Sequence, residues 1–178
     1  MKSREFPQLE TPRLLLRKLV ETDWESVSYL RTDELVNQFV ERPKAETREK
    51  ALEFIERIRG FVDSGVSHYW CVCLKDDPEM IGSVCLWNFS EDRRIAEIGY
   101  DLKPRFQNRG LMSEAVQAVI DYGFRELKLE RIEAFTHRKN ESSKKLLLKN
   151  HFQLNPERRD EEFPENIIFE IYREAAKQ

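Results

Sequence analysis

Residues 96–116 read AEIGYDLKPRFQNRGLMSEAV, and this stretch contains the change of pattern that decides the fold. Its first part belongs to the run IAEIGYDL (95–102), which has the period-two character of a half-buried β-strand. After Pro104 comes a turn containing Gly110, and then a long amphipathic helix whose inward positions are Val116, Val119, Ile120 and Leu127. A strand, a glycine-containing turn and a helix are therefore expected in direct succession.

The segments on either side continue this alternation of strands and helices. Upstream, we expect a strand over 13–19, a short helix over about 23–31 and a longer helix that follows Thr47 and stops near Gly65. The runs YWCVCLK, MIGSVCLWNF and IAEIGYDL predict an antiparallel meander of three strands. Downstream, a strand over 131–136, a helix over about 140–150 and a strand near 166–172 complete the chain. This order indicates an α/β (α+β) protein with a mixed sheet covered by helices.

Length and charge narrow the classes of function. The 178 residues fit one compact domain over 1–178, and 30 Lys and Arg against 33 Asp and Glu leave a net charge of −3. Without a basic field, direct binding to nucleic acid or to an anionic membrane is not expected. No run approaches the roughly 20 apolar residues of a membrane helix, and the N-terminal sequence MKSREFPQLETPR lacks the apolar centre of a signal peptide. The expected location is the cytoplasm.

The cysteines and histidines do not form a metal-binding pattern. The three cysteines cannot all pair and include no Cys-x-x-Cys motif, and the three histidines lack the spacing of metal ligands. These residues are Cys71, Cys73, Cys85, His68, His137 and His151. We expect no metal cofactor, and we expect the cysteines to pack in the core.

Three short segments carry chemistry. The turn 107–114 leads into a helix, whose start exposes unpaired N–H groups, so Gly110, Arg109 and Ser113 are candidates for binding an anion; an ordinary strand-to-helix turn is the alternative. Asn140 precedes another helix and is either a simple N-cap or a ligand-binding amide. Glu97 is a solvent-facing strand residue or a general base. The turn matches neither GxxxxGK[ST] nor GxGxxG, the motifs that usually indicate nucleotide hydrolysis and dinucleotide binding, so neither function is indicated.

Taken in order, the segments resemble the GNAT superfamily of acyl-CoA-dependent N-acyltransferases. TPRLLLR (11–17), AEIGYDLKPRFQNRGLMSEAV (96–116) and RIEAFTHRKNESSKKLLLKNHF (131–152) look like three signature blocks of the branch that contains the ribosomal-protein N-terminal (alanine or serine) acetyltransferases. The resemblance spans nearly the whole chain. It implies a mixed, mostly antiparallel central sheet of about six to seven strands flanked by about four helices, with acetyl-CoA as cosubstrate.

The same resemblance implies a set of cofactor-binding residues. In the family pattern, Gln107 and Gly110 match, whereas Met112 stands where a small residue is preferred. The N–H groups of the turn would hold the pyrophosphate, the strand end would pair with the pantetheine arm, and Asn140 would hydrogen-bond that arm. The residues implied are Tyr100, Asp101, Leu102, Gln107, Asn108, Arg109, Gly110, Leu111, Met112, Ser113, Asn140 and Ser143. A second departure is His151, which replaces a small residue near the end of the last helix.

Forming an amide from a thioester requires proton transfers at both reacting centres. Glu97 is the candidate base, acting through water, and Ser143 is the candidate acid toward the CoA sulfur, with Tyr100 as the fallback. Many members of the superfamily have a tyrosine on the last helix for this role, and the matching position here is Leu147. Since no cysteine has an obvious base beside it, direct transfer in a ternary complex is expected over a covalent acetyl-enzyme.

The acceptor stays open at this stage. The resemblance favours the α-amine of a peptide or protein N-terminus, and small-molecule amines are also possible because fold does not set substrate. The helix after Thr47 and the loop 91–94 are expected to wall the acceptor side. Two alternatives are a non-catalytic acyl-CoA sensor or interaction module, and a regulatory domain for another nucleotide. A homodimer through an exposed last strand is also possible.

Overall fold

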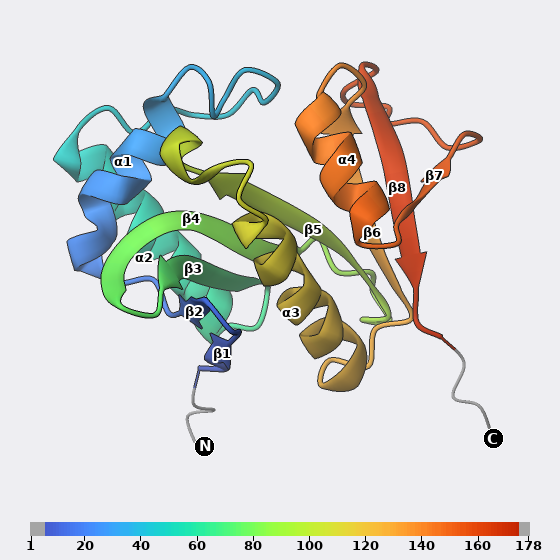
Figure 1. The fold of residues 1–178 in the computed structure, drawn as a ribbon, viewed down its shortest axis with the longest axis horizontal. Helices are drawn as coiled ribbons and strands as arrows, with labels where there is room; N and C mark the ends of the chain where they lie inside the picture. The colour runs from blue at the N-terminus through green and yellow to red at the C-terminus, as the bar shows by residue number, and fades with distance from the viewer. Residues whose placement is uncertain (1–5, 175–178) are drawn as a thin grey trace.

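A computed structural model describes residues 6–174, and its centre is one eight-stranded sheet in the order β1-β2-β3-β4-β5-β6-β8-β7 (Figure 1). Neighbouring strands are antiparallel except β5 and β6, which are parallel. The strands are β1 (Leu9–Glu10), β2 (Leu14–Arg17), β3 (His68–Leu74), β4 (Asp77–Trp87), β5 (Ile95–Leu102), β6 (Arg131–His137), β7 (Gln153–Asn155) and β8 (Asn166–Tyr172). Residues 1–5 of the N-terminal segment, from which no signal peptide is expected, lie outside the described range.

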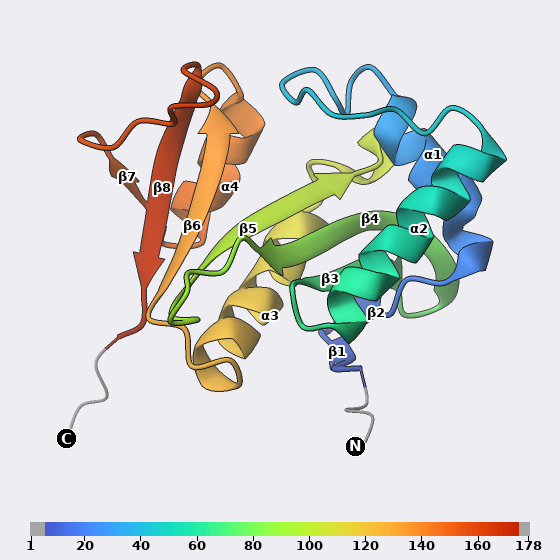
Figure 2. The same ribbon diagram turned by 180° about the vertical axis from the view of Figure 1, so that it is seen from behind.

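Helices cover both faces of this sheet, as the two opposite views in Figures 1 and 2 show. The α-helices are α1 (Trp24–Thr32), α2 (Arg48–Asp63), α3 (Leu111–Arg125) and α4 (Glu141–Lys149), and short 3-10 turns span Glu21–Asp23 and Pro104–Phe106. Apolar residues of α3 and α4 pack with the sheet in one buried cluster, and those of α1 and α2 pack with it in a second. We call these the α3/α4 face and the α1/α2 face.

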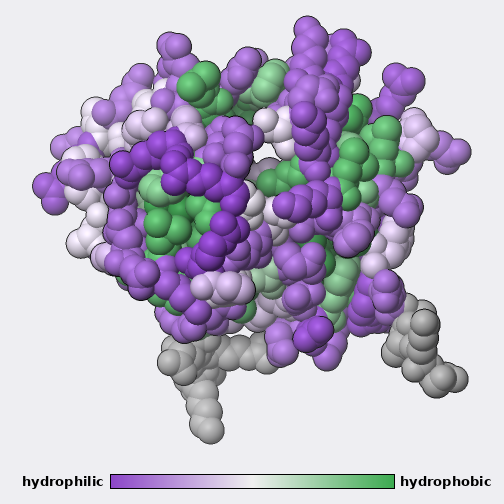
Figure 3. All heavy atoms as spheres, in the orientation of Figure 1, coloured by the Kyte–Doolittle hydropathy of each residue, from purple (hydrophilic) through white to green (hydrophobic). Residues whose placement is uncertain are grey.

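The sheet opens between its two parallel strands. β5 and β6 pair at three positions, from Ile95↔Arg131 to Glu97↔Glu133, and then diverge. The rest of β5 keeps its pairing with β4, and the rest of β6 keeps its pairing with β8. Figure 3 shows the surface hollowed at this place, between β5 and α4. This splay, which we call the notch, brings the ends of two strands and the starts of two helices to one location.

The elements predicted from the pattern of apolar residues are present, and the sheet is larger than the expected six to seven strands. The additional strands, β1 and β7, have two and three residues, too few for a period-two pattern to show. The expectation that the last strand is an exposed edge is wrong, because Gln153–Asn155 returns to pair with the middle of β8. Within residues 6–174 no helix is long and apolar enough to cross a membrane.

Candidate active site

Beyond Glu97, the edge of β5 that faces the notch is not paired with β6, whereas the opposite edge stays paired with β4. The Lys103 N–H donates to the Ile81 C=O at 2.9 Å, and the register runs back from there without interruption to Glu97↔Trp87. Since pairs in an antiparallel ladder alternate, residues 97, 99 and 101 exchange hydrogen bonds with β4, and residues 98, 100 and 102 direct their N–H and C=O groups toward the notch. The Gln107 amide covers one of these groups, donating to the Leu102 C=O at 3.0 Å. An extended ligand can pair with this open edge as an added strand would.

The turn before α3 presents backbone donors on the α3/α4 side of the notch. Gly110 is the N-cap, at φ 75°, a left-handed conformation that a residue without a Cβ adopts easily. Because Gly110 has no side chain to cap the helix, the N–H groups of Leu111, Met112 and Ser113 have no acceptor within α3. These N–H groups and the positive end of the helix dipole form an anion site.

Two cations surround the same helix start. A Cβ on Gly110 would lie 3.5 Å from the Arg13 Nη2 and 4.0 Å from the Lys149 Nζ. Arg13 arrives from the loop before β2, donates to the Arg109 C=O at 3.0 Å and pairs with Glu114 at 2.7 Å. The space above Gly110 therefore lies between backbone donors and two positive side chains, which fits a pyrophosphate. Arg13 stands in the first resemblance block and Lys149 in the third, but sequence spacing contains no signal that they meet.

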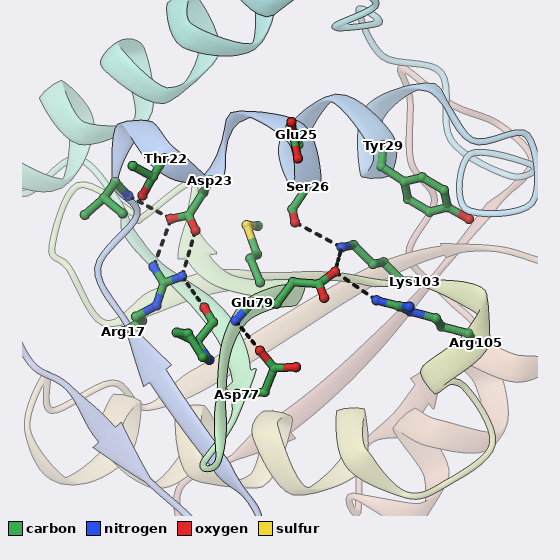
Figure 4. A pocket seen from close by; sticks show the side chains of 13 residues that line it. Arg17, Thr22, Asp23, Glu25, Ser26, Tyr29, Asp77, Glu79, Lys103 and Arg105 are labelled. Atoms are coloured by element: carbon green, nitrogen blue, oxygen red, sulfur yellow. Dashed lines mark hydrogen bonds and ion pairs between the residues drawn. The ribbon is translucent and has the colours of Figure 1, made fainter.

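The strand side of the turn is anchored by a buried lysine (Figure 4). Lys103, only 8% exposed, donates to the Ser26 hydroxyl at 3.0 Å and pairs with Glu79 at 2.5 Å, and Arg105 pairs with the same carboxylate at 2.8 Å. These residues line a cavity of about 920 Å³ beside α1, which Glu97 and Ser143 do not line. The cavity's ion pairs fix the 3-10 turn that leads into Gln107, so we interpret it as an anchor of the loop.

Asn140 and Ser143 lie at the start of α4, across the notch from β5. Asn140 caps the helix through its side-chain oxygen, which accepts from the Ser143 N–H at 3.1 Å, so the simple capping role is present. The Ser143 hydroxyl is buried and lies 2.6 Å from the Tyr100 hydroxyl. Burial raises the pKa of Tyr100 to about 12, although the Ser143 hydrogen bond acts in the opposite direction. The two candidate acids thus form one hydrogen-bonded pair.

Glu97 lies on the other face of the sheet. Residues 97 and 100 are three apart in a regular strand, so their side chains point to opposite faces, with Tyr100 in the α3/α4 cluster. Burial raises the pKa of Glu97 to about 7; the Asn88 amide at 3.4 Å acts against this, whereas Asp160 and Glu133 add to it. A carboxyl group with this pKa is half ionised at neutral pH, which suits a general base.

The other acidic residue of β5 has a structural role. Asp101, on the same face as Glu97, pairs with Arg42 at 3.0 Å and accepts from the Ser83 hydroxyl at 2.6 Å. Arg42 belongs to the loop 33–47, and Phe39 of that loop contacts His137 at the end of β6, with ring centroids 5.2 Å apart and the rings tilted by 31°. The loop therefore spans the α1/α2 side of the notch. Residue alternation turns the Asp101 N–H toward β4, so of Asp101 and Leu102 only the latter directs a backbone donor into the notch.

The residues that depart from the family pattern are accommodated by the fold. Met112 is 6% exposed and packs in the α3/α4 cluster, so its bulk points away from the anion site. Leu147 is fully buried in the same cluster and offers no hydroxyl. His151 adopts φ 66° in a Schellman ending of α4, with the Phe152 N–H donating to the Leu147 C=O at 3.0 Å. Glycine is the usual residue there, which explains the family preference for a small residue.

The cysteines provide no activated thiolate. Cys71 and Cys73 are fully buried, as expected for core residues, and Cys85 is partly exposed. Burial raises the pKa of each thiol, that of Cys85 to about 12. The described residues also contain no cluster of three His, Cys, Asp or Glu side chains that could hold a metal ion.

The fold and the site together define a class of protein. A sheet that opens between two parallel strands, a helix start with unpaired N–H groups on one face and a carboxyl group with a pKa of about 7 on the other are compatible with an acyl-CoA-dependent transferase. Residues 13–153 match the family model described as an acetyltransferase (GNAT) domain, and the chain belongs to that family. It is an acetyl-CoA-dependent N-acetyltransferase.

One relative in sequence and two solved structures illustrate what the chain is similar to, the structures in fold alone. The uncharacterized N-acetyltransferase YoaA of Bacillus subtilis (strain 168) is 33% identical over 148 residues, which cover 83% of this chain and 84% of that protein. The structure of the ribosomal-protein-S5-alanine acetyltransferase from Vibrio fischeri superposes with a TM-score of 0.81 at 21% identity, covering 97% of this chain and 100% of that one. The ribosomal L7/L12 α-N-protein acetyltransferase RimL, in complex with coenzyme A, gives 0.81 at 18% identity, with 93% and 98% covered.

Proposed function

We propose that this protein moves the acetyl group of acetyl-CoA to a primary amine, with the α-amine of a protein or peptide N-terminus as the favoured acceptor and a small-molecule amine as the second. The observation that carries the proposal is the position of Glu97, a carboxyl group with a near-neutral pKa where the sheet begins to open. Two proteins of similar structure are described as acetyltransferases of ribosomal proteins, and this similarity favours the peptide acceptor.

The residues divide between holding the cosubstrate and moving protons. Acetyl-CoA supplies an acetyl group activated as a thioester. The turn 107–113, with Arg13 and Lys149 beside it, would hold the pyrophosphate. The open edge of residues 98–102 and the Asn140 amide would hold the pantetheine arm. These interactions fit because every one uses a backbone or side-chain group that faces the notch or the start of α3.

Proton transfer is proposed at both faces of the sheet. Glu97 takes the acceptor's proton through water on the α1/α2 face. On the α3/α4 face the Tyr100 and Ser143 pair delivers a proton to the leaving sulfur, with the Ser143 hydroxyl as donor and Tyr100 as its hydrogen-bonded reserve. The raised pKa of Tyr100 keeps that hydroxyl protonated at neutral pH, as an acid must be. With the thiol groups held protonated, transfer is direct, in a ternary complex.

An acceptor screen tests the proposal. Release of the CoA thiol is measured with acetyl-CoA and three acceptor classes: peptides with free N-termini, polyamines and aminoglycosides. The matched variant is Glu97→Gln, which keeps side-chain size and removes the base. Release of the CoA thiol that depends on an acceptor and is slower in this variant supports the proposed acetyltransferase activity. Binding of CoA without release for any acceptor would instead favour the acyl-CoA sensor, and equal thermal stabilisation by ATP would favour a nucleotide-binding regulator.

Three further properties stay predictions. The whole of residues 1–178 is proposed to act as one acyltransferase domain, located in the cytoplasm. A homodimer is compatible with the fold, but its contact would have to use a surface other than β8, which β7 covers. Size-exclusion chromatography with light scattering measures this state directly.

A further inference from the structure

The most exposed aromatic side chain near the notch is Trp87, on the α1/α2 face. Trp87 ends β4 and is the direct cross-strand partner of Glu97, so the two side chains project from the same face about 5 Å apart at their Cβ atoms. The Trp87 side chain is 46% exposed, whereas Trp70 in the neighbouring strand is fully buried. This exposed ring lies beside a carboxyl group, so one part of the surface offers both an aromatic face and a negative charge.

The indole leans along the sheet over a residue that has no side chain. Its Nε1 lies 3.8 Å from the position that a Cβ on Gly99 would occupy, and the Cys85 Sγ lies 3.2 Å from it. Gly99 belongs to the part of β5 that has no β6 partner. The Trp87 ring, Gly99 and the Glu97 side chain thus lie together on the α1/α2 face of the sheet, and we call this group the Trp87 site.

Besides burial, the charged groups that raise the pKa of Glu97 are Asp160 and Glu133, which are both acidic. Glu97 accepts one weak hydrogen bond from Asn88, at 3.4 Å, and has no ion pair with any described residue. Asp160, held in place by the Asn166 amide at 2.8 Å, adds a second negative field at Glu97. Arg42 is paired with Asp101, and Arg131 and Arg158 are paired with Glu133, the β6 residue in register with Glu97.

The Trp87 ring is also without a cationic partner. Arginine and lysine side chains lie over six other aromatic rings among the described residues, including that of Phe89, with Arg93 at 4.0 Å. No such contact involves Trp87 among residues 6–174, although tryptophan attracts cations most strongly. The exposed ring of Trp87 can therefore accept a cation from a ligand.

We propose that Trp87 is the specificity-determining residue for the acceptor: it holds the ammonium form of a primary amine against its ring, beside Glu97, and the site favours amines that have no carboxylate on the adjacent carbon. This inference rests on the proposed function. Glu97, acting through water, takes one proton from the ammonium group, leaving a neutral carboxyl group and a neutral amine. The neutral amine loses its attraction to the ring and is free to move into the notch. Peptide N-termini and alkylamines meet this condition, whereas the carboxylate of a free amino acid is repelled by Glu97 and Asp160.

Matched probes and variants test the proposal. The probes are alaninamide and alanine, which differ in the carboxylate, and the variants are Trp87→Leu and Trp87→Phe, with Tyr172→Leu, another exposed aromatic residue at the end of β8, as the control. We expect kcat/KM for alaninamide to exceed that for alanine by about 100-fold. We also expect Trp87→Leu to raise the KM for alaninamide about 10-fold without changing the KM for acetyl-CoA, with Trp87→Phe between the two. An unchanged KM for alaninamide, or an equal rise for acetyl-CoA, would overturn the assignment.

Fluorescence separates failure of this inference from failure of the proposed function. Alaninamide binding to wild-type protein is expected to change the emission of the exposed indole in a saturable way, and Trp87→Leu is expected to abolish that change. If no acceptor releases the CoA thiol but this titration behaves as expected, the proposed function fails and the Trp87 site stands. If neither wild type nor variant responds to alaninamide, the Trp87 site fails, whatever the turnover with other amines.

Discussion

The pH dependence of turnover is the sharpest test of Glu97. With its pKa at about 7, the ionised fraction is about 0.09 at pH 6 and about 0.91 at pH 8, so the contribution of the base rises roughly 10-fold over this interval. We expect kcat/KM of the wild type to show this rise, superimposed on the ionisation of the acceptor amine. Glu97→Gln should remove the part of the pH profile that comes from ionisation of Glu97 and keep the part that comes from the amine. It should also lower turnover about 10²- to 10⁴-fold, with CoA affinity nearly unchanged.

Two neighbouring substitutions test the physical cause of the shifted pKa. Asn88→Gly removes the hydrogen bond that favours the ionised carboxylate, and glycine suits the left-handed φ of 49° at this position, so the part of the pH profile that comes from Glu97 should move to higher pH. Asp160→Asn removes a like charge and should move the same part of the profile to lower pH. The rates are measured as CoA thiol release at saturating acetyl-CoA. If Glu97→Gln keeps wild-type turnover from pH 6 to 9, Glu97 is not the base, and a site that only positions the reactants becomes the better account.

The same carboxyl group links stability to pH. Because the folded-state pKa of Glu97 lies above its ordinary value of 4.5, its contribution to stability is present below pH 4.5 and is lost as pH rises through about 7. Glu97→Gln should therefore gain stability relative to wild type between pH 5 and pH 8. The upper limit is about 3 kcal/mol, reduced by solvent screening because the group is only partly buried. Urea unfolding of wild type and variant at pH 5 and pH 8 measures the difference in their free energies of unfolding. A difference that does not change with pH would contradict the raised pKa of Glu97.

Three other variants test the rest of the site. Gly110→Val should weaken CoA binding at least 10-fold by calorimetry while the far-UV spectrum stays folded, because its side chain would occupy the space between Arg13 and Lys149 at a strained φ; unchanged affinity would make the turn purely structural. Ser143→Ala should lower turnover more than CoA affinity if its hydroxyl protonates sulfur, and an equal loss would assign it to holding the cosubstrate. His151→Gly should raise the free energy of unfolding, measured in urea, by about 1 kcal/mol, because glycine adopts the left-handed φ of 66° without steric cost. An unchanged free energy of unfolding would mean that histidine is not strained at this position.

The sequence by itself determined the elements and the class of site. Period-two runs and helical spacing are local properties, so the meander, the helices and the turn at Gly110 were all predictable from residues close together in the chain. The order of the three blocks carried the family resemblance, which the family model confirms. The short strands β1 and β7 were not predicted, because a strand of two or three residues forms through its partner and has too few residues to show a pattern of its own.

Only the tertiary structure decided which residues share a site and on which face they act. The pairing of Arg13 with Glu114 spans about a hundred residues, and no local pattern foretells it. Strand alternation and the splay of β5 from β6 placed Glu97 on one face and the Tyr100 and Ser143 pair on the other, separating the proposed base from the proposed acid. Of the two acidic residues in IAEIGYDL, Asp101 is paired with Arg42, whereas Glu97 has no ion pair among residues 6–174. Charge pairing and desolvation depend on neighbours in space, which the order of residues does not contain.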